Sequence, residues 1–259
     1  MKILNGEELA GFIKERQAAQ VRQMQKKPKL LILRDSDNQV ITKYVNLKKQ
    51  YGEDIGVEVL DIYAKPDALR QEIIRANTDD TIKGIILQLP IQDKDKTDEI
   101  TNLIAPEKDV DGLSENGNFE SATATAILWL LAGYDIKLEN KKIAIVGRGK
   151  LVGAPLYKMF KNSNYNVDLF HRGDDLTNLN RYDIIITATG APGLISSSMI
   201  KPGAIVIDAG TASEKGVLKG DLAEEVRERT DLTAITPKLG GVGPLTVSAL
   251  FDHVIQASN

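Results

Sequence analysis

The sequence contains no cysteine and only two histidines, His171 and His253. The lack of cysteine excludes disulfide bonds, thiolate metal ligands and a cysteine nucleophile, and it is compatible with a cytosolic protein. Two histidines leave little material for a histidine-based catalytic triad or metal site. We therefore expect no bound metal.

Strong charge of one sign and long apolar runs are also missing. The net charge of −3 over 259 residues gives no basic face for nucleic acid or for a membrane surface. No apolar run reaches membrane-spanning length, and the N-terminal segment MKILNGEELAGFIKERQ lacks the apolar core of a signal peptide. We expect a soluble cytoplasmic protein that binds neither nucleic acid nor membrane and is long enough for two domains.

The most informative stretch is Lys141–Pro155, KKIAIVGRGKLVGAP. Its apolar run Lys142–Val146 predicts a buried strand of a parallel sheet, and Leu156–Phe160 is the apolar side of a helix. Between them lie three glycines, Gly147, Gly149 and Gly153. A strand, a glycine turn and a helix can bind a dinucleotide, because the backbone approaches the pyrophosphate at the helix N-terminus. The spacing is one residue longer than the common fingerprint, so the motif alone leaves a plain glycine turn open.

Strands and helices alternate along the chain. The expected strands are short buried runs: Lys29–Leu33, Val57–Tyr63, Gly84–Leu89, Lys142–Val146, Asn166–Phe170, Asp183–Thr187, Ala204–Asp208 and Leu232–Thr236. The expected helices are Glu7–Lys26, Gln39–Ile55, Asp67–Asn77, Thr97–Asn102, Ala122–Ala132, Leu156–Phe160 and a C-terminal helix after Lys238. This alternation predicts an α/β protein with parallel sheets. The long polar connection Pro106–Ser121 is uncommon unless it serves a site or joins domains.

Short motifs follow one another in a fixed order. They are Tyr44-x-x-x-Lys48, Leu87-Gln88-Leu89-Pro90, Pro106-Glu-Lys-Asp-Val-Asp-Gly112, Gly147-Arg148 to Val152-Gly153-Ala-Pro155, and Gly240-Gly241-Val-Gly243-Pro244-Leu-Thr246. Over nearly the whole chain they resemble the bifunctional methylenetetrahydrofolate dehydrogenase/cyclohydrolase family. The resemblance implies two parallel-sheet α/β domains with a cleft between them. Residues 1–120 plus 244–259 would bind folate, and residues 121–243 would form a Rossmann-type NAD(P)-binding domain.

The resemblance also implies a function. The expected reactions are oxidation of 5,10-methylenetetrahydrofolate to 5,10-methenyltetrahydrofolate with NADP, and hydrolysis of that product to 10-formyltetrahydrofolate. The expected partners are tetrahydrofolate derivatives and a second copy of the chain in a homodimer. A nucleotide-dependent dehydrogenase of another small substrate, or a catalytically silent dinucleotide-binding homologue, stays open. Retention of Tyr44, Lys48, Gln88 and Asp111 favours the folate enzyme.

The catalytic residues expected from the resemblance are Lys48, Tyr44, Gln88 and Asp111. Tyr44 and Lys48 lie four residues apart on a predicted helix and share a face. A lysine can transfer protons when burial lowers its pKa, although spacing alone favours a packed Tyr44 and a solvated Lys48. Asp111 would hold the N–H groups of the pterin ring, and Gln88 would lie beside the folate ring and the lysine. Without the resemblance, Asp111 is an ordinary turn residue and Gln88 a strand-end residue satisfied by the backbone.

The expected contacts form two sets. For the substrate they are Tyr44, Lys48, Gln88, Leu89, Pro90, Asp111, Gly240, Gly241 and Pro244. For the dinucleotide they are Gly147, Arg148, Gly149, Val152, Gly153, Pro155, His171, Arg172, Thr189, Gly190, Gly210, Gly243 and Thr246.

The end of the strand Asn166–Phe170 predicts the choice of cofactor. In this type of fold an acidic residue there binds the ribose hydroxyl of NAD, whereas a cation accommodates the 2′-phosphate of NADP. The strand is followed by His171 and Arg172, and Arg148 is a further cation in the glycine turn. We therefore predict NADP over NAD, although Arg172 could merely face solvent. Acidic residues lie nearby and could weaken a phosphate site: Asp168, Asp174 and Asp175.

Several positions depart from the family pattern. Ile41 and Gly149 each replace a serine of the family, which removes a hydroxyl near the expected ligands. Ser121-Ala-Thr123-Ala124 replaces Pro-x-Thr-Pro, and Ile91-Gln92 replaces a second Leu-Pro. These departures leave open whether both steps proceed at full activity.

Overall fold

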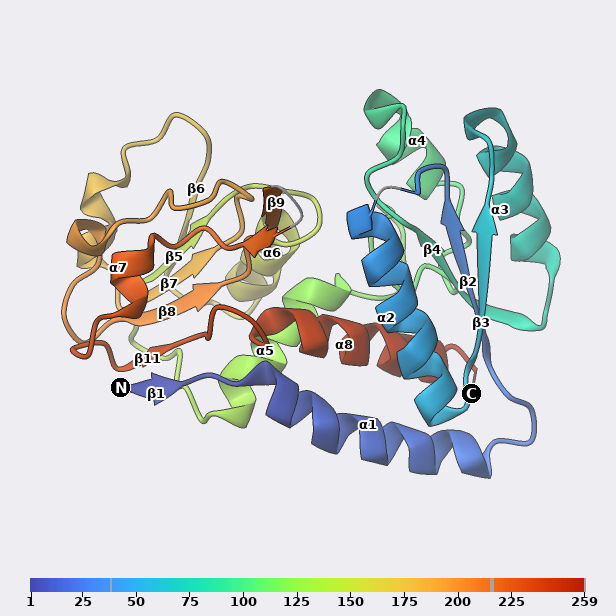
Figure 1. Cartoon of the computed structure of the whole chain (residues 1–259), viewed down its shortest axis with the longest axis horizontal. Coiled ribbons are helices and arrows are strands. Elements are labelled where there is room, and N and C mark those ends of the chain that lie inside the picture. Colours follow the sequence, from blue (N-terminus) through green and yellow to red (C-terminus); the bar gives the residue numbers. More distant parts are fainter. Residues whose placement is uncertain (38, 215–216, 259) are drawn as a thin grey trace. The chain divides into compact units, whose positions relative to one another are not determined.

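The computed structural model describes residues 1–37, 39–214 and 217–258. It divides into two compact units (Figure 1). The first unit comprises Met1–Ala10 and Thr123–Thr246, and the second comprises Gly11–Ala122 and Val247–Asn259. The unit boundaries fall inside three helices, α1 (Gly6–Gln23), α5 (Ala122–Gly133) and α8 (Val242–Gln256).

The second unit contains a three-stranded parallel sheet in the order β3-β2-β4. The strands are β2 (Lys29–Arg34), β3 (Glu58–Tyr63) and β4 (Ile82–Leu87). Helix α2 (Gln39–Ile55) connects β2 to β3, and a 3₁₀ turn, η1 (Pro66–Ala68), leads into α3 (Leu69–Thr78) before β4. The central strand β2 is buried over four successive residues, as its continuous apolar sequence predicts, whereas the edge strand β3 is half-buried or exposed throughout.

The connection after β4 carries η2 (Lys94–Lys96) and α4 (Thr97–Thr101), and then no regular element before α5. Its end returns to the sheet, because Ile85 N donates to Lys108 O at 2.8 Å. The Lys108 ammonium donates to the carbonyls of Ala76, Asn77 and Asp79 at 2.8 to 2.9 Å, which caps the C-terminal end of α3. Lys108, the lysine of the motif Pro106–Gly112, is therefore a structural residue that fixes the loop before Asp111.

The first unit contains a six-stranded parallel sheet in the order β1-β11-β8-β7-β5-β6. Its strands are β1 (Lys2–Ile3), β5 (Ile143–Val146), β6 (Val167–Phe170), β7 (Ile184–Thr187), β8 (Ile205–Asp208) and β11 (Ala234–Ile235). Its helical segments are α6 (Gly153–Asn162), η3 (Leu176–Arg181), η4 (Ser197–Met199) and α7 (Glu224–Arg227). The predicted α/β class with parallel sheets is confirmed. The helix after the glycine turn spans Gly153–Asn162 and includes the predicted apolar side Leu156–Phe160.

Two features of the first unit were not predicted. β1 has two residues with exposed side chains, so it lacks the apolar run that marks a strand. The hairpin of β9 (Ala212–Glu214) and β10 (Val217–Lys219) interrupts the regular alternation of strands and helices.

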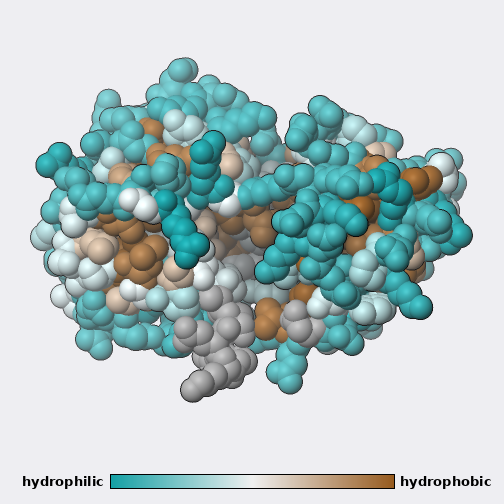
Figure 2. All heavy atoms as spheres, turned by 90° about the horizontal axis from the view of Figure 1, so that it is seen from above, coloured by the Kyte–Doolittle hydropathy of each residue, from teal (hydrophilic) through white to brown (hydrophobic). Residues whose placement is uncertain are grey.

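The face drawn in Figure 2 is largely hydrophilic, with hydrophobic side chains in separate patches. Over the described part of the chain, no helix combines the length and the apolar character needed to cross a membrane.

Candidate functional site

Lys48 and Gln88 meet in the second unit. Lys48 lies on α2, and its Nζ donates to Gln88 Oε1 at 2.9 Å. Gln88 directly follows β4, and its own amide donates to Leu89 O at 3.2 Å, so its carbonyl oxygen is turned to the lysine. Both side chains are half-buried, and the peptide bond between Leu89 and Pro90 is cis. The two predicted residues are thus brought together by a helix and a strand end.

The electrostatics of this cluster link Lys48 to Asp111. Burial lowers the pKa of the Lys48 ammonium, and the negative charge of Asp111 opposes that shift. Burial raises the pKa of the Asp111 carboxyl, opposed by Lys48 and reinforced by Asp109. Desolvation is the larger cause for both groups, so the neutral amine of Lys48 is reached at a lower pH than in an ordinary lysine. A neutral amine can accept a proton, which a solvated ammonium cannot.

Asp111 lies in a firmly held turn. Ala122 N donates to Asp111 O at 3.2 Å, which ties the turn to the start of α5. The neighbouring carboxylate of Asp109 is buried, and its Oδ2 accepts from Ser114 N at 2.7 Å and from Ser114 Oγ at 2.6 Å. Among the described residues, Asp109 Oδ1 has no hydrogen-bond partner. The turn therefore holds two carboxylates close together, and Asp109 makes Asp111 harder to ionise.

His253 joins the same cluster, which the sequence did not predict. It is 6% exposed on α8, and its Nδ1 lies 2.8 Å from Val110 O. Its ring stacks on Phe119 with centroids 4.8 Å apart, and its charge lowers the pKa of Asp111. The only signal in the sequence was its place on the apolar side of the C-terminal helix, which does not reveal the loop that it contacts.

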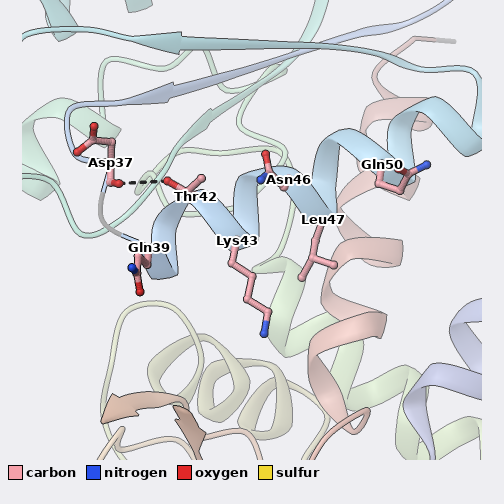
Figure 3. A pocket seen from close by; sticks show the side chains of 7 residues that line it. All are labelled: Asp37, Gln39, Thr42, Lys43, Asn46, Leu47 and Gln50. Carbon is pink, nitrogen blue, oxygen red and sulfur yellow. Dashed lines mark hydrogen bonds between the residues drawn. The ribbon is translucent and has the colours of Figure 1, made fainter. Parts of the chain in front are cut away.

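Tyr44 lies on α2 one turn before Lys48 and is half-buried. A cavity of about 650 Å³ lies along a different set of α2 residues (Figure 3). The side chains of Lys43 and Leu47 point to the same side of α2. Thr42 Oγ1 donates to Asp37 O at 3.2 Å. The residues that line this cavity are Asp37, Gln39, Thr42, Lys43, Asn46, Leu47 and Gln50. None of them is a predicted substrate contact, so the hollow and the predicted site lie on different faces of α2.

The departures from the family pattern have structural explanations in part. Ile41 is 2% exposed and belongs to the core. Gln92 N donates to both carboxylate oxygens of the buried Asp35 at 3.1 and 3.0 Å, which ties the loop after β2 to the loop after Pro90. Ser121 and Ala124 are buried as well. Gly149 differs, because it is exposed and a Cβ there would meet nothing within 4 Å.

In the first unit, the glycine turn after β5 is shaped by close backbone contacts. Gly147 has φ of +113°, and a Cβ there would lie 2.4 Å from Ala188 O. A Cβ on Gly153 would lie 1.7 Å from Gly147 O. Helix α6 begins at Gly153, Val152 provides no side-chain cap, and Pro155 lies in the first turn. No side chain caps this helix N-terminus, although Ala154 N donates to Gly149 O at 3.1 Å. The positive end of the helix dipole beside an open Gly149 fits the pyrophosphate of a dinucleotide.

A cavity of about 870 Å³ lies at the end of β6. Arg148 and His171 both line it, whereas Arg172, the second predicted cation, is exposed and does not line it. The lining residues are Arg148, Ala154, Tyr157, Asp168, Leu169, Phe170, His171, Asp174, Asp175 and Tyr182.

The three carboxylates of this cavity already accept hydrogen bonds. Asp168 accepts from Tyr182 OH at 2.7 Å, and Asp174 accepts from His171 N at 2.7 Å. Asp175 Oδ1 accepts from Thr177 N at 2.9 Å and so caps η3. Each acidic group is therefore held by a local partner.

The remaining predicted contacts lie in loops of the first unit and in the first turns of α8. Thr189 and Gly190 follow β7, and Gly210 follows β8. Gly240 and Gly241 precede α8, and Gly240 O accepts from Glu7 N at 2.9 Å. Gly243, Pro244 and Thr246 occupy the first turns of α8, where Thr246 Oγ1 donates to Val242 O at 3.3 Å. The predicted residues thus form a lysine, glutamine and aspartate cluster in one unit and a set of loop residues in the other.

A half-buried cluster of Lys48, Gln88 and Asp111 in one α/β unit and a Rossmann-type glycine turn in the other are typical of a nucleotide-dependent enzyme. The family model "Tetrahydrofolate dehydrogenase/cyclohydrolase, catalytic domain" matches residues 4–111, and the model "Tetrahydrofolate dehydrogenase/cyclohydrolase, NAD(P)-binding domain" matches residues 121–259. The chain belongs to the bifunctional methylenetetrahydrofolate dehydrogenase/cyclohydrolase family. Membership gives it two activities in one-carbon metabolism, oxidation of methylenetetrahydrofolate and hydrolysis of methenyltetrahydrofolate.

Known proteins resemble the chain over its full length. The bifunctional protein FolD of Staphylococcus epidermidis is 34% identical over 99% of this chain and 96% of its own. The crystal structure of the FolD enzyme of Campylobacter jejuni matches with a TM-score of 0.92 and 31% identity, over 100% of this chain and 98% of that one. The Trypanosoma brucei enzyme, complexed with NADP cofactor and inhibitor, matches with a TM-score of 0.90 and 28% identity, over 99% and 96%.

An NAD-dependent methylenetetrahydrofolate dehydrogenase of Saccharomyces cerevisiae shares the fold. Its structure matches with a TM-score of 0.80 at 18% identity, over 97% of this chain and 95% of that one. At that identity the likeness concerns the fold alone.

Proposed function

We propose that Lys48 is the proton-transfer residue for hydrolysis of 5,10-methenyltetrahydrofolate and that NADP is the hydride acceptor for the preceding oxidation. The observation that carries the first part is the 2.9 Å hydrogen bond from Lys48 Nζ to Gln88 Oε1, at an ammonium whose pKa is lowered by burial. A lysine in such a place can act as a general base at a pH where a solvated lysine is fully charged.

The oxidation and the hydrolysis make different chemical demands on the site. Oxidation of the methylene bridge needs the carbon to be held against the nicotinamide, so positioning is the main task. NADP, when bound, takes up the hydride. Hydrolysis then needs water to attack the methenyl carbon and to lose a proton. The neutral amine of Lys48 takes that proton, and Gln88 Oε1 accepts a hydrogen bond from the ammonium so formed.

Asp111 and Tyr44 serve the substrate in this proposal. A carboxylate can accept two charge-assisted bonds from adjacent N–H groups of a pterin ring. The turn around Asp111 is held to α5 by the bond from Ala122 N, which supports a fixed orientation. Tyr44 lies one turn from Lys48 on α2 and shares its face. Leu89 and Pro90, which follow Gln88, and Gly240, Gly241 and Pro244 complete the proposed substrate set.

NADP is preferred over NAD in this proposal because of charge at the end of β6. Arg148 and His171 line one cavity, and Arg172 is exposed next to it in sequence. Three carboxylates line the same cavity and oppose this preference, because the local hydrogen bond that each accepts holds it in place without removing its charge. The NADP complex of the trypanosomal relative agrees with this choice. The remaining predicted cofactor contacts, from Gly147 to Thr246, form the proposed path of the dinucleotide.

The assembly and the domain limits are proposals of the same kind. The resemblance supports a homodimer in the cytoplasm. It also supports a folate-binding domain of residues 1–120 plus 244–259 and a dinucleotide-binding domain of residues 121–243. Sedimentation of the purified chain would give a mass of two chains if the dimer is right and of one chain if it is wrong.

One assay tests the function as a whole. The purified protein is incubated with 5,10-methylenetetrahydrofolate and either NADP or NAD while the methenyl chromophore is followed. We expect the chromophore to form faster with NADP and then to decay by hydrolysis. A faster reaction with NAD would contradict the cofactor choice. A chromophore that decays no faster than in buffer would contradict the hydrolytic role.

A further inference from the structure

One buried carboxylate holds the loop that follows β7. Asp221 is 0% exposed, and its Oδ2 accepts from Thr189 N at 2.7 Å while its Oδ1 accepts from Ala191 N at 3.0 Å. The two oxygens thus take up the two amides that flank Gly190. Asp221 comes 30 residues after Ala191 in the chain, so this arrangement depends on the tertiary fold and not on a local turn.

A second carboxylate holds Asp221 itself. Asp208, at the end of β8, accepts from Asp221 N at 3.0 Å and from Gly210 N at 3.1 Å through Oδ1. Its Oδ2 accepts from Arg227 at 2.5 Å and from Leu222 N at 3.3 Å. Arg227 therefore balances one of the two negative charges, and a continuous chain of bonds runs from Arg227 through Asp208 and Asp221 to the loop after β7.

Two glycines make room for this network. A Cβ on Gly210 would lie 2.1 Å from the carboxyl carbon of Asp221, and a Cβ on Gly220 would lie 2.0 Å from Asp208 Oδ2. Neither contact is possible for a real side chain, so both carboxyl groups rest directly on bare glycine backbone. Gly210 is also a predicted cofactor contact, and the structure adds a packing reason for a glycine at this position.

We propose that Asp221 is a positioning residue for the dinucleotide, which it serves by fixing the backbone of Thr189 and Gly190 from behind. The network lies at the carboxyl ends of β7 and β8, where open parallel sheets bind their ligands. The inference rests on the proposal that Thr189 and Gly190 contact the cofactor. Burial and the charge of Asp208 raise the pKa of Asp221, so the fold keeps this carboxyl at an energetic cost, which is more common at functional sites.

The amino end of β7 offers a matched control residue, Asp183. Asp183 precedes β7, its Oδ2 accepts from Lys142 N at 2.7 Å, and its Oδ1 accepts from Lys201 Nζ at 2.7 Å. It therefore also ties backbone to the sheet through a carboxylate. Because it lies at the amino end of β7, its loss should weaken the fold without reaching the loop that we assign to the cofactor.

The test compares Asp221→Asn with Asp183→Asn in the full-length enzyme. Asparagine keeps the shape of Asp221 but turns an amide NH₂ toward one of the two backbone N–H groups. We expect the KM for NADP to rise at least tenfold in Asp221→Asn, with a smaller change in kcat. Hydrolysis of chemically prepared methenyltetrahydrofolate without any dinucleotide should proceed at the wild-type rate. Asp183→Asn should lower Tm and leave the KM for NADP unchanged.

Gly210→Ala is the second variant, because it pushes on the Asp221 carboxyl without removing it. It should also raise the KM for NADP, and it decides the matter if Asp221→Asn does not fold. An unchanged KM in the folded variants, or an equal rise in Asp183→Asn, would overturn the inference. A wild-type enzyme that uses neither NADP nor NAD would instead defeat the proposed function, so the two failures are distinguishable.

Discussion

The cluster of Lys48, Gln88 and Asp111 and the cavity at the end of β6 differ in how far their charged side chains are exposed to solvent. Lys48 and Asp111 in the second unit are desolvated, and burial shifts the pKa of each toward its neutral form. Arg148, His171 and Arg172 in the first unit are exposed. Chemistry at the methenyl carbon needs a group that can change its protonation state, which burial provides. Binding of an anionic cofactor needs permanent charge and accessible backbone N–H groups, which exposure permits.

This difference predicts different responses to salt and to mutation. Exposed charges are screened at moderate ionic strength, whereas buried ones are screened much less. Raising the salt concentration should therefore weaken NADP binding more than it slows hydrolysis. Single substitutions in the buried cluster should have the larger effects, because each leaves a desolvated partner behind.

The largest effect is expected for Lys48→Met. Lys48 donates to Gln88, whereas the buried motif lysine Lys108 is engaged by three backbone carbonyls. Hydrolysis should therefore fall by roughly 10²- to 10⁴-fold, the usual contribution of general acid–base catalysis. Folate should still bind. The matched control is Lys49→Met, since Lys49 is the next residue on α2 and lies 3.8 Å from Asp61 with 48% of its side chain exposed. A Lys48→Met enzyme that hydrolyses at the wild-type rate would show that the role is wrongly assigned.

The next largest effect is expected for Asp111→Ala. Loss of a buried charged hydrogen-bonding group should weaken folate binding by about 2 to 5 kcal/mol, with nucleotide affinity nearly unchanged. Calorimetry with each ligand separately measures both affinities. Asp37→Ala removes an exposed carboxylate of the same unit and should change neither. Equal loss of both ligands in Asp111→Ala would indicate a folding defect instead of a lost anchor.

A smaller effect is expected at the exposed cations. Arg148→Ala and Arg172→Ala should each lower the ratio of kcat/KM for NADP to that for NAD by roughly fivefold, since exposed ion pairs contribute up to about 1 kcal/mol. The effect of Arg148 should be the larger, because Arg148 lines the cavity at the end of β6 and Arg172 does not. It should shrink as salt is raised. A wild-type preference for NAD, or an unchanged ratio in both variants, would contradict the assignment.

The smallest effect is expected in the pH profile. The neutral amine is the active form of Lys48, so hydrolysis should be lost as pH falls through a pKa that lies below the ordinary lysine value. Asp111 opposes the lowering of that pKa. Asp111→Asn should therefore move this limb of the kcat profile to lower pH, measured with saturating substrate. A limb that stays in place, or that moves to higher pH, would show that the two groups are not coupled in this way.

The sequence predicted the regular part of the fold because its signals are local. β2 and β5 are continuous apolar runs, and α2 has the predicted bounds Gln39–Ile55. β1 was missed because it has only two residues and becomes a strand only by pairing with β11. A strand of that length carries no pattern of its own and is defined by its partner.

The site was predictable to a similar degree. The nearness of Lys48 and Gln88, 40 residues apart in the chain, was implied by the family resemblance, and the structure confirms that they meet. His253 and Asp221 were missed, because their partners are backbone atoms of distant loops. Backbone partners leave no trace in the side-chain pattern, so only the fold reveals them.

The rate of methenyltetrahydrofolate hydrolysis in the absence of any dinucleotide tests most directly whether Lys48 acts independently of the two arginines. It is measured side by side for the wild-type enzyme, Lys48→Met and the double variant Arg148→Ala/Arg172→Ala. We expect equal rates for the wild type and the double arginine variant and almost complete loss of hydrolysis in Lys48→Met. Loss of hydrolysis in the arginine variant, or its survival in Lys48→Met, would contradict the division of labour between the two regions.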